Sequence, residues 1–165
     1  MIHTKNPEVL KAINGMIIGA HNYLSNNSVF IMQQLFSDAA WLDSFVKTTR
    51  RRLTMQYVAL KRALDSAEIP VAECHGSLML FADFSEFLGE DTWEAEEELD
   101  EELFREVKLH AQSGRCFLAS SPGWFRLMFT AQTFHSEEEI AEPFEELGRR
   151  LRKWREGRQS GLEKR

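Results

Sequence analysis

The sequence predicts an α/β fold in which a small sheet has helices on one side and a long helical arm precedes it. A stripe of apolar residues with helical spacing runs through residues 39–67, which predicts one long helix. Two apolar and aromatic runs, residues 78–84 and 124–129, have the composition of strands. A second helical stripe lies near the C-terminal end. The order is helices first and then β-β-α-β-β-α, which is typical of layered α/β domains.

The composition is that of an ordinary globular protein. The chain has 165 residues, of which 43% are hydrophobic and 28% charged, and this length suits one medium domain or a piece of a larger one. A formal charge of −6 argues against nucleic-acid binding, and no apolar run is long enough for a membrane span. Cys74 and Cys116 form no disulfide or zinc pattern, so we expect free thiols in a reducing, cytoplasmic setting.

The N-terminal part reads as three helices. Residues 6–20 form the first, with Asn6 as its cap and Pro7 at the first helical position. Residues 29–36 are apolar on several faces, which suits a buried helix. The long helix of residues 39–67 also carries a basic set, which either faces solvent or binds an anion: Arg50, Arg51, Arg52, Lys61 and Arg62.

Pro70 ends the long helix, and residues 71–74 form a possible edge strand. Residues 78–84 are almost continuously apolar, which predicts a strand covered on both faces. An acidic helix capped by Asp91 or Thr92 then runs to about Val107. Its acids lack the spacing of a calcium loop, so we expect a solvated face.

The remaining elements follow in short order. Residues 108–111 form a possible short strand, and residues 112–121 form a loop. The last helix starts near Ser136, with Glu139 placed as in a capping box and Pro143 bending or delaying it. The tail, residues 157–165, is expected to be disordered.

One cation, Arg126, lies in the strand that follows the Pro122-Gly123 turn. A guanidinium in an apolar run must extend to solvent, pair with an acid, or face a cavity and bind an anion. Its planar fork matches the two oxygens of a carboxylate. A structural ion pair with one of the many acids of the chain is the alternative. Phosphate-binding glycine loops, catalytic serine elbows and metal-ligand spacings are absent from the sequence.

Several segments together resemble a known family. They are residues 106–109 (Glu-Val-Lys-Leu), Gly114 and residues 121–129 (Ser-Pro-Gly-Trp-Phe-Arg-Leu-Met-Phe), with weaker matches at residues 52–53, 69–71, 81–83 and 93–99. This pattern resembles the C-terminal part of a fold-type-I, pyridoxal-phosphate-dependent class I/II aminotransferase. The 1-aminocyclopropane-1-carboxylate (ACC) synthase-like group is the most similar branch, because it has Glu-Pro-Gly-Trp-Phe-Arg at the same spacing.

The resemblance implies a role for Arg126: it grips the α-carboxylate of the amino-acid substrate. The full-length enzymes of this family use pyridoxal phosphate and form homodimers. The resemblance also implies a division of the chain into four parts. Residues 1–38 are a remnant of the large cofactor-binding domain, residues 39–68 the interdomain helix, residues 69–156 the small C-terminal domain, and residues 157–165 the tail.

The family's Schiff-base lysine lies in a Ser-x-Ser-Lys segment that this sequence does not contain. No residue here matches the family's catalytic or cofactor-binding positions, so we expect no stable binding of pyridoxal phosphate. The family's Ser-Pro-Gly is Gln112-Ser113-Gly114, and its Ala-Gly-Leu/Phe-Phe is Gly76-Ser77-Leu78-Met79. The expected function is the C-terminal portion of an aminotransferase-like or ACC-synthase-like enzyme, inactive alone. The alternative is a non-catalytic truncated protein that serves as an oligomerisation or interaction module.

Overall fold

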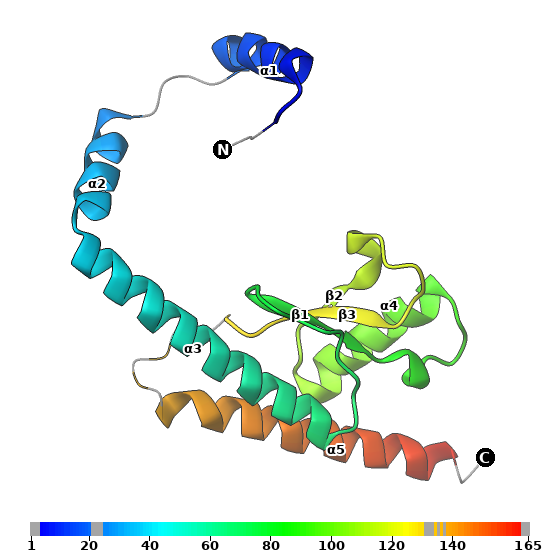
Figure 1. Cartoon of the computed structure of the whole chain (residues 1–165). Helices are drawn as coiled ribbons and strands as arrows, with labels where there is room; N and C mark the ends of the chain where they lie inside the picture. The colour runs from blue at the N-terminus through cyan, green and yellow to red at the C-terminus, as the bar shows by residue number, and fades with distance from the viewer. Residues whose placement is uncertain (1–3, 21–24, 131–133, 135, 137, 163–165) are drawn as a thin grey trace. The chain divides into compact units, whose positions relative to one another are not determined.

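The chain divides into two compact units, Met1–Lys47 and Thr48–Arg165. The computed structural model describes residues 4–20, 25–130, 134, 136 and 138–162. The first unit contains α1 (Pro7–Ala20), α2 (Asn26–Ser37) and the start of α3 (Ala39–Ser66). Helix α3 continues into the second unit, which contains the sheet and the remaining helices (Figure 1).

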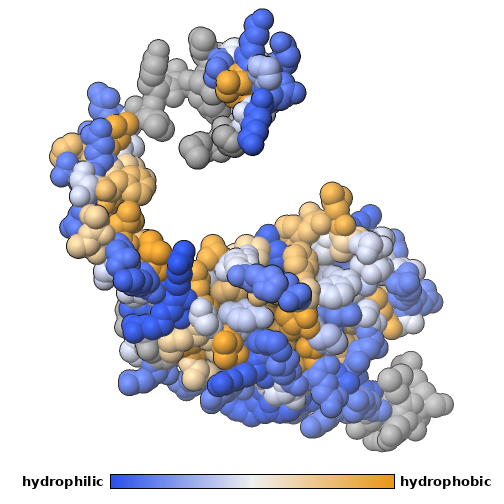
Figure 2. All heavy atoms as spheres, in the orientation of Figure 1, coloured by the Kyte–Doolittle hydropathy of each residue, from blue (hydrophilic) through white to orange (hydrophobic). Residues whose placement is uncertain are grey.

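Helices α1 and α2 lie where the sequence predicts them, but α2 is not buried. At α1, the side chain of Asn6 accepts a hydrogen bond from the N–H of Glu8 at 3.0 Å, as expected of a cap. No residue of α2 is buried, and Phe30 and Phe36 are 62% and 61% exposed. Figure 2 shows hydrophobic side chains on the surface along α2. The prediction of a buried helix is therefore wrong for this chain, because no described element covers these side chains.

Helix α3 confirms the long helix predicted from the apolar stripe. The Asp38 carboxylate accepts a hydrogen bond from the N–H of Trp41 at 2.9 Å at its start. Near its end, Leu60 and Leu64 are buried. Of the basic set, Lys61 pairs with Asp65 one turn later at 2.7 Å and is half exposed. Such a pair is a surface feature and contributes little to stability.

The sheet has three antiparallel strands in the order β1-β3-β2. Strand β1 is Met79–Asp83, β2 is Gln112–Ser113 and β3 is Trp124–Met128. Residue 81 of β1 and residue 112 of β2 both pair with Arg126 of β3. The arginine strand is therefore the centre of the sheet.

Three strand predictions need correction. Residues 71–74 contribute only a single bridge, between Val71 and Ala82. Residues 108–111 are not a strand, because Lys108 adopts a left-handed conformation (φ 59°) and β2 starts only at Gln112. Strand β1 is not covered on both faces: buried and half-buried residues alternate along it, as in a sheet with one open side.

The acidic helix starts as predicted and changes form before its end. Thr92 caps α4 (Trp93–Glu102) by accepting a hydrogen bond from the N–H of Ala95 at 3.2 Å. A single π-helical turn, η2 (Leu103–Val107), follows. Four acids of α4 face solvent as expected, and Asp100 and Glu102 are half-exposed; the exposed acids are Glu94, Glu97, Glu98 and Glu101. Glu96 is buried, and the prediction of a wholly solvated acidic face is wrong for this residue.

The last helix, α5, comprises Ala141–Leu162 and follows a short 3-10 turn, η4 (Glu138–Ile140). Ser136 accepts a hydrogen bond from the N–H of Glu139 at 3.4 Å, consistent with the expected cap. Pro143 lies in the first turn of α5, where its missing N–H has no intrahelical partner to lose. The helix reaches Leu162, so the predicted disordered tail is helical over residues 157–162, and residues 163–165 lie outside the described residues.

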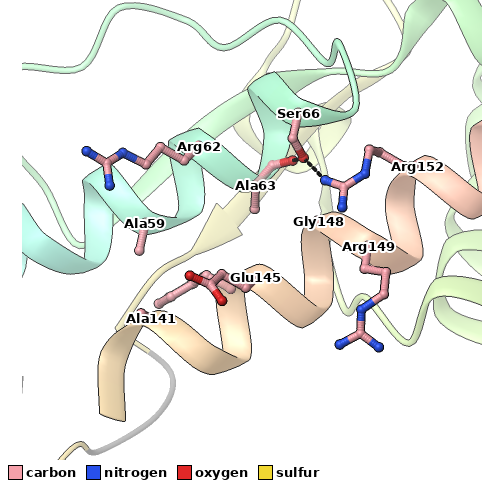
Figure 3. Close-up of a pocket in the computed structure, with 10 residues that line it drawn as sticks. Ala59, Arg62, Ala63, Ser66, Ala141, Glu145, Gly148, Arg149 and Arg152 are labelled. Carbon is pink, nitrogen blue, oxygen red and sulfur yellow. Dashed lines mark hydrogen bonds between the residues drawn. The ribbon is translucent and has the colours of Figure 1, made fainter. Parts of the chain in front are cut away.

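Helices α3 and α5 approach closely where both carry small residues. A Cβ on Gly148 would lie 3.2 Å from Cα of Ala63 and 3.0 Å from Oγ of Ser66. Above this contact, the guanidinium of Arg152 donates to Oγ of Ser66 at 2.5 Å (Figure 3). Arg62 and Arg149 also line the hollow beside this contact, but their guanidinium groups point in different directions in Figure 3 and do not converge on a common ligand position.

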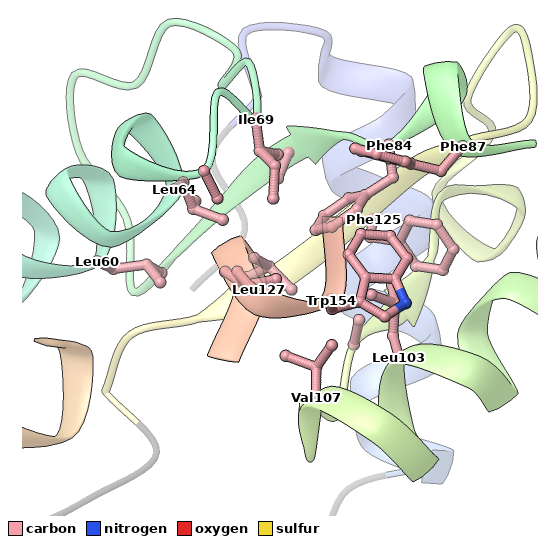
Figure 4. Packing of buried hydrophobic residues seen from close by; sticks show 14 of the residues in the cluster. Leu60, Leu64, Ile69, Phe84, Phe87, Leu103, Val107, Phe125, Leu127 and Trp154 are labelled. Atoms are coloured by element: carbon pink, nitrogen blue, oxygen red, sulfur yellow. The ribbon is translucent and has the colours of Figure 1, made fainter. Parts of the chain in front are cut away.

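The core lies on one face of the sheet, where α3, α4, η2 and α5 cover the strands (Figure 4). Its residues come from every one of these elements: Leu60 and Leu64, Leu99, Leu103 and Val107, Leu151 and Trp154, together with Leu80, Ala82, Phe125 and Leu127 of the strands. Trp154 also donates a hydrogen bond to the Glu102 carboxylate at 2.7 Å. This arrangement confirms the predicted small sheet with α-helices on one side, while the short 3-10 helix η3 (Gly114–Phe117) contacts the other face through Phe117.

Candidate functional site

The open face of the sheet carries Arg126. Along β3, Phe125 and Leu127 point into the core and are buried, while Arg126 is half-buried on the opposite face. This alternation follows from the period of two in a strand. It places the cation where a ligand can reach it.

The turn before β3 requires its glycine. Gly123 has a φ of +95°, which L side chains rarely adopt, and a Cβ there would lie 2.6 Å from Cα of Ser85. Its carbonyl accepts a hydrogen bond from the N–H of Phe84 at 2.8 Å. The Pro122-Gly123 pair therefore fixes how the chain enters β3 and, with it, the position of Arg126.

Two side chains hold the guanidinium of Arg126. The ring of Phe117, at the end of η3 (Gly114–Phe117), lies 3.9 Å from the guanidinium carbon, which is close for a cation–π contact. The amide oxygen of Gln112 accepts a hydrogen bond from Nη2. Phe81 of β1 packs edge-on against Phe117, with ring centroids 5.8 Å apart. The cation thus has an aromatic neighbour on one side and a polar neighbour on the other.

Within the residues the structure describes, no carboxylate forms an ion pair with Arg126. Other arginines of the chain do pair: Arg155 contacts Glu86 at 2.6 Å, and Arg158 contacts Glu102 at 2.7 Å. The alternative of a structural ion pair at Arg126 therefore finds no support in this part of the chain. Its charge and most of its five N–H donors are available to an anion.

Sequence reasoning did not identify the neighbours of Arg126. Gln112 is paired with it across the sheet, and Phe117 reaches it from the end of η3, so neither contact has a local sequence signal. Glu96 was also missed, although a signal existed. It precedes Leu99 by three residues and Leu103 by seven, so it continues the buried stripe of its helix.

The lysines in the described part of the chain lie in environments unlike that of a cofactor-binding lysine. Lys5, Lys11 and Lys47 are exposed, and so are Lys108 and Lys153. A lysine that forms a Schiff base needs a lowered pKa, which requires burial or a neighbouring cation. Among the described residues, the remaining lysine, Lys61, is paired with Asp65. The lysines that the structure describes therefore do not fit pyridoxal phosphate. In the same part of the chain, no cluster of acidic, histidine or cysteine side chains is suited to a metal ion.

Comparison with known proteins assigns the chain to a family. The family model for aminotransferase class I and II matches residues 2–145. The chain belongs to this family. None of the helices in the described residues has the length and apolar character needed to cross a membrane.

Curated relatives of this aminotransferase chain include several ACC synthases. One of Cucurbita maxima is 26% identical over 129 residues, covering 78% of this chain and 26% of the relative. A protein of Mus musculus named probable inactive 1-aminocyclopropane-1-carboxylate synthase-like protein 2 is 26% identical over 136 residues, covering 82% of this chain and 23% of the relative. The chain thus spans about a quarter of the length of these relatives.

Solved aminotransferase-type structures share the fold. Cystalysin of Treponema denticola, a structure that contains pyridoxal 5'-phosphate, superposes with a TM-score of 0.62 at 16% identity, covering 91% of this chain and 36% of that one. The aromatic aminotransferase of Pyrococcus horikoshii gives a TM-score of 0.57 at 14% identity, covering 76% and 30%. Pyridoxal phosphate is therefore the cofactor of the family to which the chain belongs. The fold class is the C-terminal α/β part of these enzymes.

Proposed function

We propose that this chain is the C-terminal portion of a pyridoxal-phosphate-dependent aminotransferase or ACC-synthase-like enzyme, in which Arg126 binds the α-carboxylate of an amino-acid substrate. The observation that carries this proposal is the environment of Arg126. Its guanidinium lies on the open face of the sheet, stacked on Phe117, without a carboxylate partner among the described residues. The family membership supplies the substrate class, since its curated relatives include ACC synthases.

The geometry suits a carboxylate more than a rounder anion. One Nη2 donor of Arg126 points to Gln112, which fixes the plane of the fork. The remaining donors can form two parallel hydrogen bonds to two oxygens of one carboxylate. Phe117 shields one face of the guanidinium from water, which strengthens these bonds. In an open site such a pair is worth about 1 kcal/mol or less, so tight binding requires the rest of the enzyme to exclude water.

We further propose that this chain alone is inactive, because none of its described lysines is placed to hold the cofactor. Pyridoxal phosphate supplies the electron sink of the family's chemistry when it is bound. The test is to add it to the purified chain, reduce with borohydride and map the modified lysines. We expect no specific product at Lys5, Lys11 or Lys47 and no stable visible absorption band. Stoichiometric labelling of one lysine contradicts the proposal.

The carboxylate role of Arg126 is tested separately by NMR of the arginine side chains in the isolated chain. An L-amino acid is titrated against its α-amide, which has the same side chain but no carboxylate. We expect the Arg126 Nε–H signal to move with the acid and to stay in place with the amide, and Arg126→Lys to remove the response. Equal shifts with both compounds, or a response at Arg152 alone, contradict this role.

A second candidate function is an interaction module, and the exposed apolar side chains of α2 favour it. Phe30, Ile31 and Phe36 are all more than half exposed. Such surfaces promote association. We expect concentration-dependent oligomers in size-exclusion chromatography and a monomer after Phe30→Ser with Phe36→Ser. A monomer of the unchanged chain contradicts this candidate.

For the whole enzyme we propose a cytoplasmic homodimer, in line with the family.

A further inference from the structure

One buried acid stands out in the acidic helix α4. Glu96 is 1% exposed, whereas Glu94, Glu97 and Glu98 on the same helix are exposed. A buried carboxylate is costly unless hydrogen-bond donors replace the water it loses. The donors that hydrogen-bond to the Glu96 carboxylate therefore indicate which segments it holds in place.

Two segments that flank Arg126 donate hydrogen bonds to this carboxylate. Oε2 of Glu96 accepts a hydrogen bond from the N–H of Gly123 at 2.5 Å. Oε1 accepts one from the hydroxyl of Ser113. The same hydroxyl oxygen accepts a hydrogen bond from the N–H of Arg115 at 3.1 Å, which starts η3. Glu96 thus joins the turn before β3 to the strand β2 and the loop after it.

The residues that Glu96 contacts are close neighbours, in the chain or in the sheet, of Arg126 and of the side chains that touch it. Gly123 is the last residue before β3. Ser113 pairs with Phe125 on the core side of the sheet, and its neighbour Gln112 pairs with Arg126 on the open side. Strand β2 has only these two pairs, so the ladder alone holds it weakly. The η3 turn that Ser113 caps ends at Phe117, whose ring stacks on Arg126.

We propose that Glu96 is a positioning residue for carboxylate recognition at Arg126. From the core side of the sheet, its carboxylate fixes the Gly123 turn and β2 together, and these two segments set the positions of Arg126, Gln112 and Phe117. Glu96 touches no ligand and acts only through these segments. This inference rests on the proposed carboxylate role, but its first test is independent of any ligand.

The test uses the full chain with labelled arginine side chains. The Nε–H signal of Arg126 reports its position, because the Phe117 ring lies close enough to shift it. In Glu96→Ala we expect this signal to move toward its position in Phe117→Leu. We also expect the amide hydrogen of Gly123 to exchange about tenfold faster, as for the loss of one hydrogen bond to a charged group.

Two further variants sharpen the result. Glu98→Ala removes the same charge from an exposed position of α4 and should leave the Arg126 signal in place. Glu96→Gln should retain most of the wild-type signal, because its amide oxygen accepts from Gly123 and its amide nitrogen donates to Ser113. If Glu96→Ala does not fold, Ser113→Ala decides, since it removes one of the two hydrogen bonds and should shift Arg126 partway. An unchanged Arg126 signal in the folded variant overturns the proposal.

Titrating the same variants with an amino acid and with its α-amide distinguishes this inference from the proposed function. A merely structural role would lower the melting temperature of Glu96→Ala without changing the preference of the folded chain for an amino acid over its amide. We expect that preference to fall severalfold. If amino acids never shift Arg126 but Glu96→Ala still moves it, the carboxylate role fails and the positioning role stands. If the preference survives Glu96→Ala, the positioning role fails and the carboxylate role stands.

Discussion

The guanidinium of Arg126 is oriented before any ligand arrives. Phe117 covers one side of the fork, and Gln112 accepts one of its hydrogen bonds, while neither neutralises its charge. Preorganised donors bind a carboxylate with a smaller loss of side-chain entropy than a free arginine does. At the scale of the residue, the site is therefore an oriented guanidinium whose charge no described carboxylate neutralises.

The stacking contact makes the first prediction. Phe117→Leu keeps an apolar side chain but removes the ring 3.9 Å from the guanidinium carbon. An exposed cation–π contact is worth about 0.5–1 kcal/mol, so carboxylate affinity at Arg126 should fall about two- to fivefold. The titration of the Arg126 side-chain signal with an amino acid measures this change. Phe104→Leu, at an exposed aromatic that faces His110, is the control and should have no effect.

A second residue-level prediction concerns Asp100 on α4. Burial is the main cause that raises the pKa of this carboxyl above its ordinary value of 3.8; His110 opposes the rise, while the nearby Glu96 and Glu101 add to it. A raised pKa means that the folded state favours the protonated form. As the pH rises above 3.8, the unfolded state loses this proton first, so Asp100 destabilises the fold progressively up to its raised pKa and fully above it. We expect Asp100→Asn to increase the melting temperature at pH 7.

The gain from Asp100→Asn should shrink as the pH falls through the raised pKa toward 3.8, because the wild-type carboxyl is then protonated in both states. Melting curves of both proteins across this range measure it. Glu98→Gln, at an exposed position of the same helix, should not show the same pH-dependent gain. A loss of stability in Asp100→Asn at pH 7 would mean that the carboxylate makes a favourable contact that outweighs its burial.

At the scale of the element, β3 and its turn form the unit that matters most. The turn depends on a glycine with positive φ, its Gly123 N–H is tied to Glu96, and the strand then alternates between core and open face. Strand β3 also pairs with a strand on each side, β1 on one and β2 on the other. Its position in the sheet is therefore specified by both neighbours and by the turn.

A pair of glycine substitutions tests this element. Gly123→Ala forces a side chain into a left-handed conformation and against the backbone of Ser85, so we expect a loss of about 2–4 kcal/mol in the free energy of unfolding. Gly157→Ala lies in α5, where nothing is within 4 Å of the new Cβ, and should add about 0.5–1 kcal/mol. Denaturant unfolding measures both. Equal effects of the two changes would contradict the role of the turn.

The elements with periodic patterns could be predicted from the sequence, and those that depend on distant contacts could not. Helix α3 and strand β3 follow from their spacing of apolar residues. Strand β1 was predicted to be covered on both faces because Met79 and Phe81 are apolar, yet both lie on the open side. The apolar stripe of α4 indicates the burial of Glu96, but the donors that bond to its carboxylate lie 17 and 27 residues away. No local pattern encodes such partners.

At the scale of the whole molecule, the two compact units differ in how they are stabilised. The buried core belongs entirely to the second unit, Thr48–Arg165, and α2 in the first unit buries nothing. Helical propensity alone rarely stabilises a helix as short as the 12 residues of α2 in water. Most of the cooperative stability should therefore reside in the second unit.

Deleting residues 1–38 tests this division. We expect the melting temperature to change little, because the deleted helices contribute no residue to the core cluster. In the full chain, amide hydrogens of α2 should exchange much faster than those of β3 and α5, as measured by hydrogen exchange with mass spectrometry. A large loss of stability on deletion, or slow exchange throughout α2, would show that the first unit is held by contacts of its own, such as self-association.

The alternation of β3 also has an evolutionary consequence. Phe125 and Leu127 are buried in the core, so packing restricts which residues can replace them. Arg126 lies on the open face and does not pack in the core. Selection for folding therefore acts on mutations at positions 125 and 127, and selection for ligand binding acts on mutations at position 126. In a lineage that kept the fold but stopped using the substrate, Arg126 would drift first while its two neighbours stayed fixed. The residue at position 126 would thus report selection for the site, and the residues at positions 125 and 127 selection for the fold.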